Sequence, residues 1–331
     1  DKLFHEGTAM YFPTTTDFAG ETAPLHVVDV RERLDRELLI NANLHSTTTL
    51  ILKRANRAFP VIEPILQKYG IPDDFKYLAV IESGLVNAVS SAGARGVWQF
   101  MPETAKEKGM EINDFVDERY HLEKSTEAAC KYLLAAKNKF GSWTMAAASY
   151  NGGMNGVNKK IEEQQVTNYY DLALTEETSR YVFRILALKE IMKNPGKYGF
   201  NIYPTDLYSP IPTKKIEVDS TITDLASFAK TQGINYKILK IHNPWLRDKK
   251  LVNSSKKKSL WLLLASIAFV AIGFWLVIEA DNLTGWRAKN PIFTRGIGIA
   301  GIVFFGLGIF VGIKRLIKSE IALIIDSEGL N

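Results

Sequence analysis

Two stretches near the end of the chain, Leu260–Ile278 and residues 296–313, contain no charged residue. A membrane-spanning helix needs about 20 predominantly apolar residues, and a buried helix of a soluble protein seldom runs that long without a charge. Trp261 and Trp275 lie near the ends of the first stretch, as residues of an interfacial aromatic belt do. The sequence therefore predicts two membrane-spanning helices within a tail that covers residues 254–331.

The basic residues around these stretches predict an orientation in the membrane. A two-span hairpin has both of its ends on one side, and the positive-inside rule assigns the more basic flanks to the cytoplasm. The basic residues outside the hairpin are Lys256, Lys257, Lys258, Lys314, Arg315 and Lys318, and those of its connecting loop are Arg287, Lys289 and Arg295. The rule therefore predicts that both ends of the hairpin face the cytoplasm.

The first 200 residues have helical patterns and no convincing alternation of apolar and polar residues. Residues 1–27 have no period and are expected to form an extended lead-in. Thr175 is a predicted N-cap, because Glu176 and Glu177 follow it in the first turn of a helical pattern. The helices are expected within 28–69, from Pro72 to about Glu82, and at about 102–109, 123–139, 142–150 and 175–193. The predicted fold class is mainly α.

Composition narrows the possible functions only a little. The net charge of +5 suits an anionic polymer or a membrane surface, and no nucleic-acid partner is expected. A single cysteine, Cys130, excludes an internal disulfide, and its helical surroundings predict a small core residue. The five histidines form no cluster with ligand-like spacing, so no metal or cofactor is expected. The chain begins at Asp1, which indicates either a removed targeting segment or a fragment.

A single glutamate, Glu82, ends an apolar helical run in the stretch "AVIESGLVNAVSSAGARGVWQFMP" (residues 79–102). A carboxylate beside Val80 and Ile81 is unfavourable to bury unless another group pairs with it or a reaction uses it. One interpretation is a helix terminus whose side chain reaches solvent. The other is a functional carboxyl group, and the residues around it decide between the two.

Three further motifs follow Glu82 in the chain: "GVWQFMP", "SYNGG" and "SRYVFRI". They contain Gln99 and Met101, then Tyr150 and Asn151, and then Tyr181. Taken singly, each has a structural explanation, such as an aromatic core residue or a helix cap. Together, in this order, they resemble the catalytic domain of the soluble lytic transglycosylase and goose-lysozyme-like family (glycoside hydrolase family 23). The resemblance is closest to a membrane-bound subgroup and predicts a lysozyme-like catalytic domain over residues 58–200, preceded by lead-in and helices over 1–57.

The resemblance implies a peptidoglycan lytic transglycosylase that works with one carboxyl group. Glu82 would protonate the glycosidic oxygen between N-acetylmuramic acid and N-acetylglucosamine and would then, as a base, assist formation of a 1,6-anhydromuramic end. Tyr181 would orient Glu82, and Ser83 would support the adjoining loop. The glycan groove would be formed by Gly96, Gln99, Met101, Tyr150 and Asn151, with Gly96 allowing close approach of the glycan. The alternatives are a hydrolase of the same fold and a non-catalytic wall-binding membrane protein.

Residues 201–253 resemble a linker followed by a LysM carbohydrate-binding module, with a strand, a helix, a turn at Gly233 and a second helix. The module's second strand is expected to be missing or very short, because "RDKKLVN" leads directly into the first apolar stretch. The tail resembles a separate small family of two-helix bacterial membrane proteins. We therefore hypothesise that two unrelated pieces join near residues 252–256. The catalytic domain is expected in the periplasm, which conflicts with the orientation that the positive-inside rule predicts.

Overall fold

The computed structural model describes residues 10–218, 220–252, 254–281, 291–317 and 321–326. These form two compact units: unit 1 is Asp1–Pro212 with Pro244–Arg247, and unit 2 is Thr213–Asn243 with Asp248–Asn331. Three of the residues on which the predicted membrane orientation depends, Arg287, Lys289 and Lys318, lie outside the described residues.

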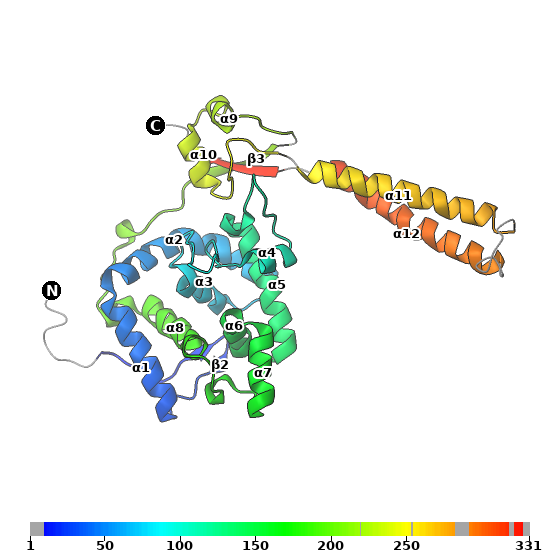
Figure 1. Ribbon diagram of the computed structural model, residues 1–331. Helices are drawn as coiled ribbons and strands as arrows, with labels where there is room; N and C mark the ends of the chain where they lie inside the picture. The colour runs from blue at the N-terminus through cyan, green and yellow to red at the C-terminus, as the bar shows by residue number, and fades with distance from the viewer. Residues whose placement is uncertain (1–9, 219, 253, 282–290, 318–320, 327–331) are drawn as a thin grey trace. The chain divides into compact units, whose positions relative to one another are not determined.

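Unit 1 is helical, as the sequence predicts, and Figure 1 shows its helices gathered around α6 and α8. Its helices are α1 (Val28–Asn43), α2 (His45–Lys68), α3 (Lys76–Ser83), α4 (Pro102–Glu107), α5 (Leu122–Phe140), α6 (Trp143–Gly152), α7 (Met154–Gln164) and α8 (Glu176–Lys193). The predicted N-cap is confirmed, because the Thr175 hydroxyl accepts a hydrogen bond from the Thr178 N–H. The sequence did not predict α7, whose one buried side chain is Val157.

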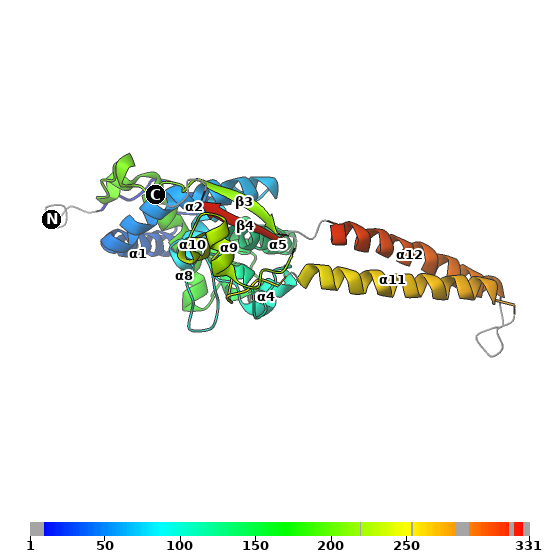
Figure 2. The same cartoon turned by 90° about the horizontal axis from the view of Figure 1, so that it is seen from above.

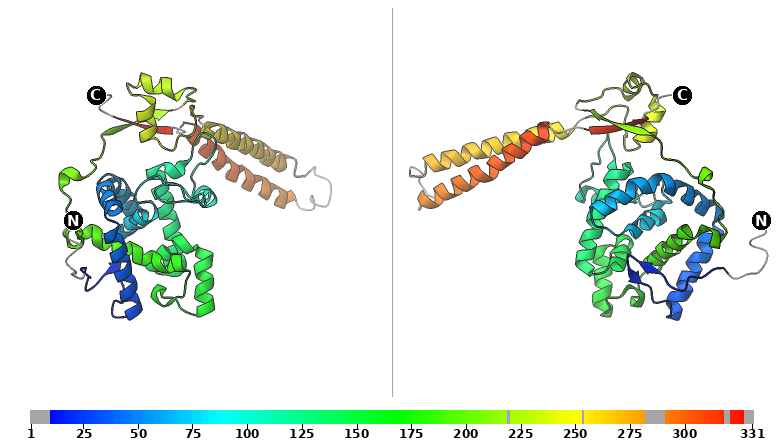
Figure 3. Two further views of the ribbon diagram at one scale, coloured as in Figure 1. Left: turned by 60° about the vertical axis from the view of Figure 1, so that its left-hand side comes forward. Right: turned by 180° about the vertical axis from the view of Figure 1, so that it is seen from behind.

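The centre of unit 1 is formed by α6, which packs against both α5 and α8. Residues 144–149 of α6 are all buried, and most of them are small, so neighbouring helices can approach its backbone closely. Helix α8 is also largely buried and packs against α1 and α3, and Figure 3 shows α1 and α8 side by side. The core therefore holds the helix that ends in "SYNGG" next to the helix that carries Tyr181.

Helix α2 crosses the predicted boundary between residues 57 and 58. It continues without interruption through Pro60 and Pro64, although each proline removes one backbone hydrogen bond from the helix. Its buried residues include Ile51 on one side of the boundary and Ile62 on the other, and both belong to the same core. The residues before the predicted domain are thus part of the same packed unit.

The lead-in contains a two-residue hairpin, β1 (Asp17–Phe18) with β2 (Glu21–Thr22), which differs from the extended segment expected. Its Glu21 carboxylate accepts hydrogen bonds from the N–H groups of Trp143 (2.7 Å) and Thr144 (2.8 Å) at the start of α6. The hydroxyl of Ser142 also donates to it, at 2.7 Å. A carboxylate at a helix N-terminus satisfies free N–H groups and interacts favourably with the helix dipole. The hairpin therefore fixes the start of the central helix.

Unit 2 contains the predicted strand and two helices as β3 (Thr213–Val218), α9 (Leu225–Thr231) and α10 (Tyr236–His242). The expectation of a missing or very short second strand is wrong, because β4 (Ile321–Asp326) pairs antiparallel with β3 over its whole length. The register joins Thr213 to Asp326, and Figure 2 shows the two strands side by side. The strand that pairs with β3 thus follows the two apolar helices in the sequence.

Side chains as well as backbone hold β4 in place. Leu323 and Ile325 are fully buried. The buried Asn243 amide donates to the Ile324 carbonyl at 2.6 Å and accepts from the Ile324 N–H at 2.9 Å, which occupies both of the amide's functions. Asn243 belongs to the "HNPWL" sequence after α10, so the link runs from the predicted module to the tail.

The two apolar stretches form α11 (Ser254–Ile278) and α12 (Pro291–Ile317), which lie side by side along their length (Figure 2). The structure confirms two helices that are long and apolar enough to cross a membrane, over Leu260–Ile278 and Pro291–Ile313. A Cβ added to Gly273 would come within 2.9 Å of the Gly298 carbonyl oxygen. Small residues thus let the two helices approach closely, as is common in membrane helix pairs.

The hypothesis of a joint between unrelated pieces near residues 252–256 stays a prediction. The boundary between the units lies near Pro212, and the tail belongs to the same unit as β3, α9 and α10. In the order of the chain, α11 and α12 lie between the two strands of one sheet.

Candidate active site

Glu82 lies in the last turn of α3, and Gly84 ends that helix in the left-handed conformation (φ 61°). One carboxylate oxygen, Oε1, accepts a hydrogen bond from the hydroxyl of Tyr181 on α8. Burial among apolar groups raises the pKa of Glu82 to about 7, although the Tyr181 hydrogen bond and the Arg184 charge oppose this effect. Its side chain remains partly exposed, so a substrate can reach it.

Helix α8 holds two residues against the end of α3. Tyr181 is 1% exposed, and both burial and the negative charge of Glu82 raise its pKa well above the usual value, so its hydroxyl keeps the proton that it donates. One turn further along α8, Arg184 Nη2 donates to the carbonyl of Ile81 at 3.0 Å. This contact fixes the backbone of Ile81, and therefore also the position of Glu82, the next residue.

The loop after Glu82 is held by Ser83 and Gln99. The Ser83 hydroxyl donates to the Val97 carbonyl at 2.8 Å. The Gln99 side-chain amide donates to the carbonyls of Ala88 (3.1 Å) and Gly96 (2.7 Å), and Gln99 itself has a positive φ of 49°. In this structure the Gln99 amide N–H groups therefore bind the loop itself, a role that the sequence did not predict.

Gly96 has a φ of 84°, and a Cβ at this position would lie 1.9 Å from the Arg119 carbonyl oxygen. From the sequence we expected this glycine to allow close approach of the glycan. The structure shows that the protein's own backbone approaches it closely. Arg119 also forms a buried ion pair with Asp117 at 2.8 Å and donates to the carbonyls of Gly93 (3.0 Å) and Phe100 (3.2 Å). The sequence analysis did not identify this arginine, whose hydrogen bonds hold the loop between Gly93 and Phe100.

Tyr150 and Asn151 lie at the end of α6. The Tyr150 hydroxyl donates to the Trp98 carbonyl at 2.8 Å, which ties α6 to the "GVWQFMP" motif. The Asn151 amide donates to Glu177 Oε1 at 3.0 Å, and its oxygen accepts from the Thr178 hydroxyl at 2.8 Å. The structure thus places the Asn151 side chain against the start of α8, the helix that carries Tyr181.

The negative charge of Glu177 also acts on Glu82 and raises its pKa. Sequence reasoning used Glu177 only as a first-turn helix residue. Its spacing from Tyr181, one turn along α8, was the signal that could have placed it near the site. Met101, another predicted groove residue, precedes the first residue of α4 without a side-chain capping hydrogen bond and is 39% exposed.

The site therefore contains one carboxyl group that is protonated below about pH 7, fixed by a tyrosine that donates to it. A partly exposed, neutral carboxylic acid suits general acid catalysis near neutral pH. Cys130 is buried in α5, as expected for a core residue. Among the residues that the structure describes, no group of three or more His, Cys, Asp or Glu side chains could hold a metal ion.

Two family models match the chain. Residues 60–172 match the transglycosylase SLT domain, and residues 214–260 match the soluble lytic transglycosylase C-terminal LysM-like domain. The first match contains Glu82 and the "SYNGG" motif, whereas Tyr181 lies after its end. The second match ends inside α11, before β4.

Among curated proteins, the chain is 29% identical over 228 residues to membrane-bound lytic murein transglycosylase D of Escherichia coli, strain K12. The same identity is found with the protein of that name from strain CFT073. A putative tributyltin chloride resistance protein of Alteromonas sp. (strain M-1) is 29% identical over 130 residues, which is 37% of this chain and 63% of that protein. The alignment with the K12 protein covers 67% of this chain, which spans about half (49%) of that relative's length. The chain therefore contains a region that matches a transglycosylase SLT domain and, after it, a region that matches a LysM-like domain.

Proposed function

We propose that this chain is a peptidoglycan lytic transglycosylase that cleaves the β-1,4 bond between N-acetylmuramic acid and N-acetylglucosamine. The observation that carries the proposal is the Glu82 carboxyl group, whose pKa of about 7 and contact with Tyr181 suit a catalytic acid. The SLT domain and the murein transglycosylases among the relatives support the choice of substrate.

In the first step, protonated Glu82 donates its proton to the glycosidic oxygen. The bond from C1 of the muramic acid to that oxygen breaks, and the N-acetylglucosamine end leaves as an alcohol. Positive charge develops at C1 and the ring oxygen, as in other glycosidases. Glu82, now ionised, stays in place because the Tyr181 hydroxyl donates to the carboxylate.

In the second step, the same Glu82 removes the proton from the C6 hydroxyl of the muramic acid, and O6 bonds to C1. The product is a 1,6-anhydromuramic end, the proton returns to Glu82, and no water is consumed. Most glycosidases divide the acid and the base or nucleophile between two carboxyl groups. An internal hydroxyl group as nucleophile lets one carboxyl group perform both proton transfers.

The neighbouring residues would bind and orient the sugar. Tyr150 and Asn151 lie half-buried at the end of α6, and Met101 offers an apolar surface next to the loop. Ser83 and Gln99 would act by holding the loop that forms one wall of the groove. We place the catalytic unit in the periplasm, associated with the membrane through α11 and α12, because mature peptidoglycan lies on that side.

The test is mass spectrometry of purified peptidoglycan digested by the full chain in detergent. The proposal expects muropeptides that end in 1,6-anhydromuramic acid. Reducing-end products, heavier by one water, would assign a hydrolase of the same fold. No cleavage by the folded protein would favour the remaining alternative, a wall-binding membrane protein without catalytic activity.

The hydrolase alternative rests on Glu177, the second carboxylate whose charge acts on Glu82. As a base it would have to activate a water molecule, and Glu177→Gln would then abolish turnover as completely as Glu82→Gln. The transglycosylase proposal expects Glu177→Gln to keep activity, because the C6 hydroxyl replaces that water. The same digestion assay separates these outcomes.

A further inference from the structure

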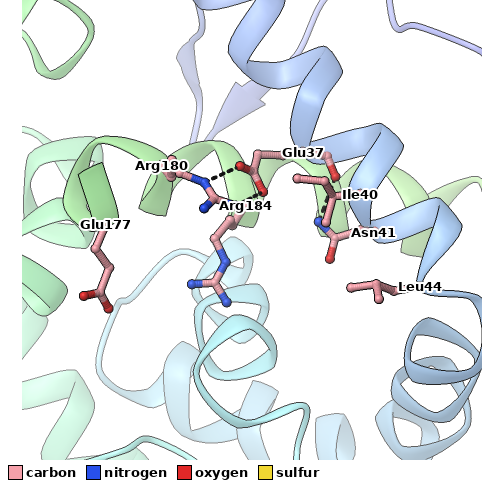
Figure 4. A pocket seen from close by; sticks show the side chains of 7 residues that line it. All are labelled: Glu37, Ile40, Asn41, Leu44, Glu177, Arg180 and Arg184. Atoms are coloured by element: carbon pink, nitrogen blue, oxygen red, sulfur yellow. Dashed lines mark hydrogen bonds and ion pairs between the residues drawn. The ribbon is translucent and has the colours of Figure 1, made fainter. Parts of the chain in front are cut away.

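A pocket of about 260 Å³ lies between α1 and α8, next to the candidate active site. Its wall includes Asn41 from α1, Leu44 directly after that helix, and Glu177 and Arg184 from α8, as Figure 4 shows. Both helices lie outside residues 60–172, so the pocket is not formed by the part of the chain that matches the SLT domain. Its volume exceeds that of a single small ion, since one water molecule takes up about 30 Å³ in the liquid.

The charged groups of the pocket are a closed ion pair, an open cation and Glu177, whose Oε1 accepts a hydrogen bond from the Asn151 amide. Glu37 is 2% exposed, and both of its oxygens accept from Arg180, at 2.7 and 3.3 Å. These two charges compensate each other. Arg184 donates to the Ile81 carbonyl, but within the described part of the chain no carboxylate lies within ion-pair distance of it. A guanidinium group has five N–H donors, so most of its hydrogen-bonding capacity is available to a ligand.

The pocket is linked directly to the reacting group. Arg184 holds the carbonyl of Ile81, the residue before Glu82, and lies one turn from Tyr181 on α8. Figure 4 shows the Arg184 side chain extending away from the Arg180–Glu37 pair. A substituent that occupies the pocket would therefore be attached close to the sugar that Glu82 protonates.

We propose that this pocket binds the peptide stem of the muramic acid at the cleaved bond, with Arg184 binding a carboxylate of the stem. The proposal rests on the proposed function, which supplies a sugar that carries a peptide with free carboxylates. Guanidinium and carboxylate groups match as bidentate hydrogen-bonding partners. Arg184 is assigned as a specificity residue, and the exposed Leu44 on the opposite wall would contact the apolar part of the stem.

The arrangement also couples stem binding to the acid. The positive charge of Arg184 lowers the pKa of Glu82 in the free protein. A carboxylate bound to Arg184 would offset that charge and leave Glu82 more fully protonated when a stem is in place.

The test measures binding in the full-length Glu82→Gln protein in detergent, so that substrates are not consumed. The two probes are glycan tetrasaccharides with peptide stems and the same tetrasaccharides after amidase removal of the stems, both studied by calorimetry. Arg184→Gln is expected to raise the Kd of the stem-bearing probe about tenfold, as for loss of a charged hydrogen bond. It should change the Kd of the stem-free probe less than twofold, and Arg184→Lys should recover part of the loss.

Three further variants guard against a folding artefact. Leu44 is 50% exposed, so Leu44→Asp should fold normally and weaken stem binding by repulsion, whereas Leu44→Lys should strengthen it. Arg36→Gln is the matched control, because it removes an exposed arginine that pairs with Glu176 between the same two helices, outside the pocket. It should leave both Kd values unchanged.

An equal rise in Kd for both probes after Arg184→Gln would overturn the proposal, as would unchanged binding of the stem-bearing probe by the Arg184 and Leu44 variants. Failure of the proposed function is a separate result. It would appear as absence of cleavage products in the digestion assay, which these binding measurements do not use.

Discussion

Glu82 is subject to influences of opposite sign. Burial and the charge of Glu177 favour its protonated form, whereas the Tyr181 hydrogen bond and the charge of Arg184 favour its ionised form. A group that must first give and then take a proton works best when neither form is strongly favoured near the working pH. The pKa of about 7 fits this double role.

Replacement of Glu82 by glutamine should remove turnover and preserve the fold. The amide keeps the shape of the side chain but has no acidic proton, and general acid–base catalysis contributes about 10²–10⁴-fold. Because Glu82 also acts as the base, kcat should fall by at least about 10²-fold. A carboxyl group whose pKa is raised in the folded state lowers the stability of the fold at any pH above its ordinary pKa of 4.5. Glu82→Gln should therefore be at least as stable as the unchanged protein at pH 8.

The control for this prediction is thermal unfolding of both proteins at pH 5 and pH 8, together with product release from purified peptidoglycan. More than a tenth of the original activity in a folded Glu82→Gln protein would mean that another residue is the acid.

The pH dependence of kcat should report Glu82 and respond to its neighbours in opposite directions. Activity should fall as pH rises through about 7, because the acid loses its proton. Tyr181→Phe removes a hydrogen bond that lowers the pKa of Glu82, so the alkaline limb should move to higher pH. Glu177→Gln removes a charge that raises this pKa, so the limb should move to lower pH. Initial rates between pH 5 and 9 decide the matter, and shifts in the same direction would contradict the assignment.

Among the elements, those with a regular apolar pattern could be predicted from sequence, and those defined by distant partners could not. The run to Glu82 and the Thr175-capped helix have local signals, and both form as expected. Helix α7 was missed because its sequence, "MNGVNKKIEEQ", has few apolar residues. Strand β4 was missed because its partner is β3, which precedes both membrane helices. Local patterns cannot indicate such a pairing.

The same limit applies within the candidate site. Glu82, Tyr150 and Tyr181 stand in recognisable motifs, so a resemblance could find them. Arg184 and Arg119 have no motif of their own, and their importance follows from the carbonyls they meet in the folded chain.

Glu21 should contribute measurably to the stability of unit 1, because it caps α6 from the β1–β2 hairpin. Burial alone would raise the pKa of Glu21, but hydrogen bonds from Thr144, Trp143 and Ser142 outweigh it and hold the pKa below 4.5. A depressed folded-state pKa adds stability that is complete above the unfolded-state pKa and is lost as pH falls through the folded-state value. Glu21→Ala should therefore cost about 1–2 kcal/mol at pH 7 and less at pH 3.

Urea unfolding at the two pH values measures this difference. Glu163→Ala serves as the control, because Glu163 pairs with Lys160 on the exposed surface of α7, where such pairs contribute little. An equal loss of stability at both pH values would assign Glu21 a packing role and not an ionic one.

At the scale of the whole molecule, the link between Asn243 and Ile324 predicts that the module and the tail lose structure together. Asn243→Ala removes both hydrogen bonds and leaves the part-buried backbone groups of Ile324 unpaired on that side, which destabilises by about 1–3 kcal/mol. Hydrogen exchange in detergent should show faster exchange in β3 and β4 and unchanged protection in α6 and α8. Unchanged protection in β3 would mean that β4 does not contribute to the module.

The pairing of β3 with β4 also sets an order of events during synthesis. β3 leaves the ribosome well before β4, and an unpaired edge strand would meanwhile be open to other chains. Closing so long a loop in a flexible chain is entropically unfavourable. If α11 and α12 pair first in the bilayer, however, the start of one helix lies beside the end of the other, and the chain left to close between β3 and β4 is much shorter. Membrane insertion would then be the step that allows the sheet to close, and a chain that failed to insert would keep an open strand that quality-control proteases can recognise.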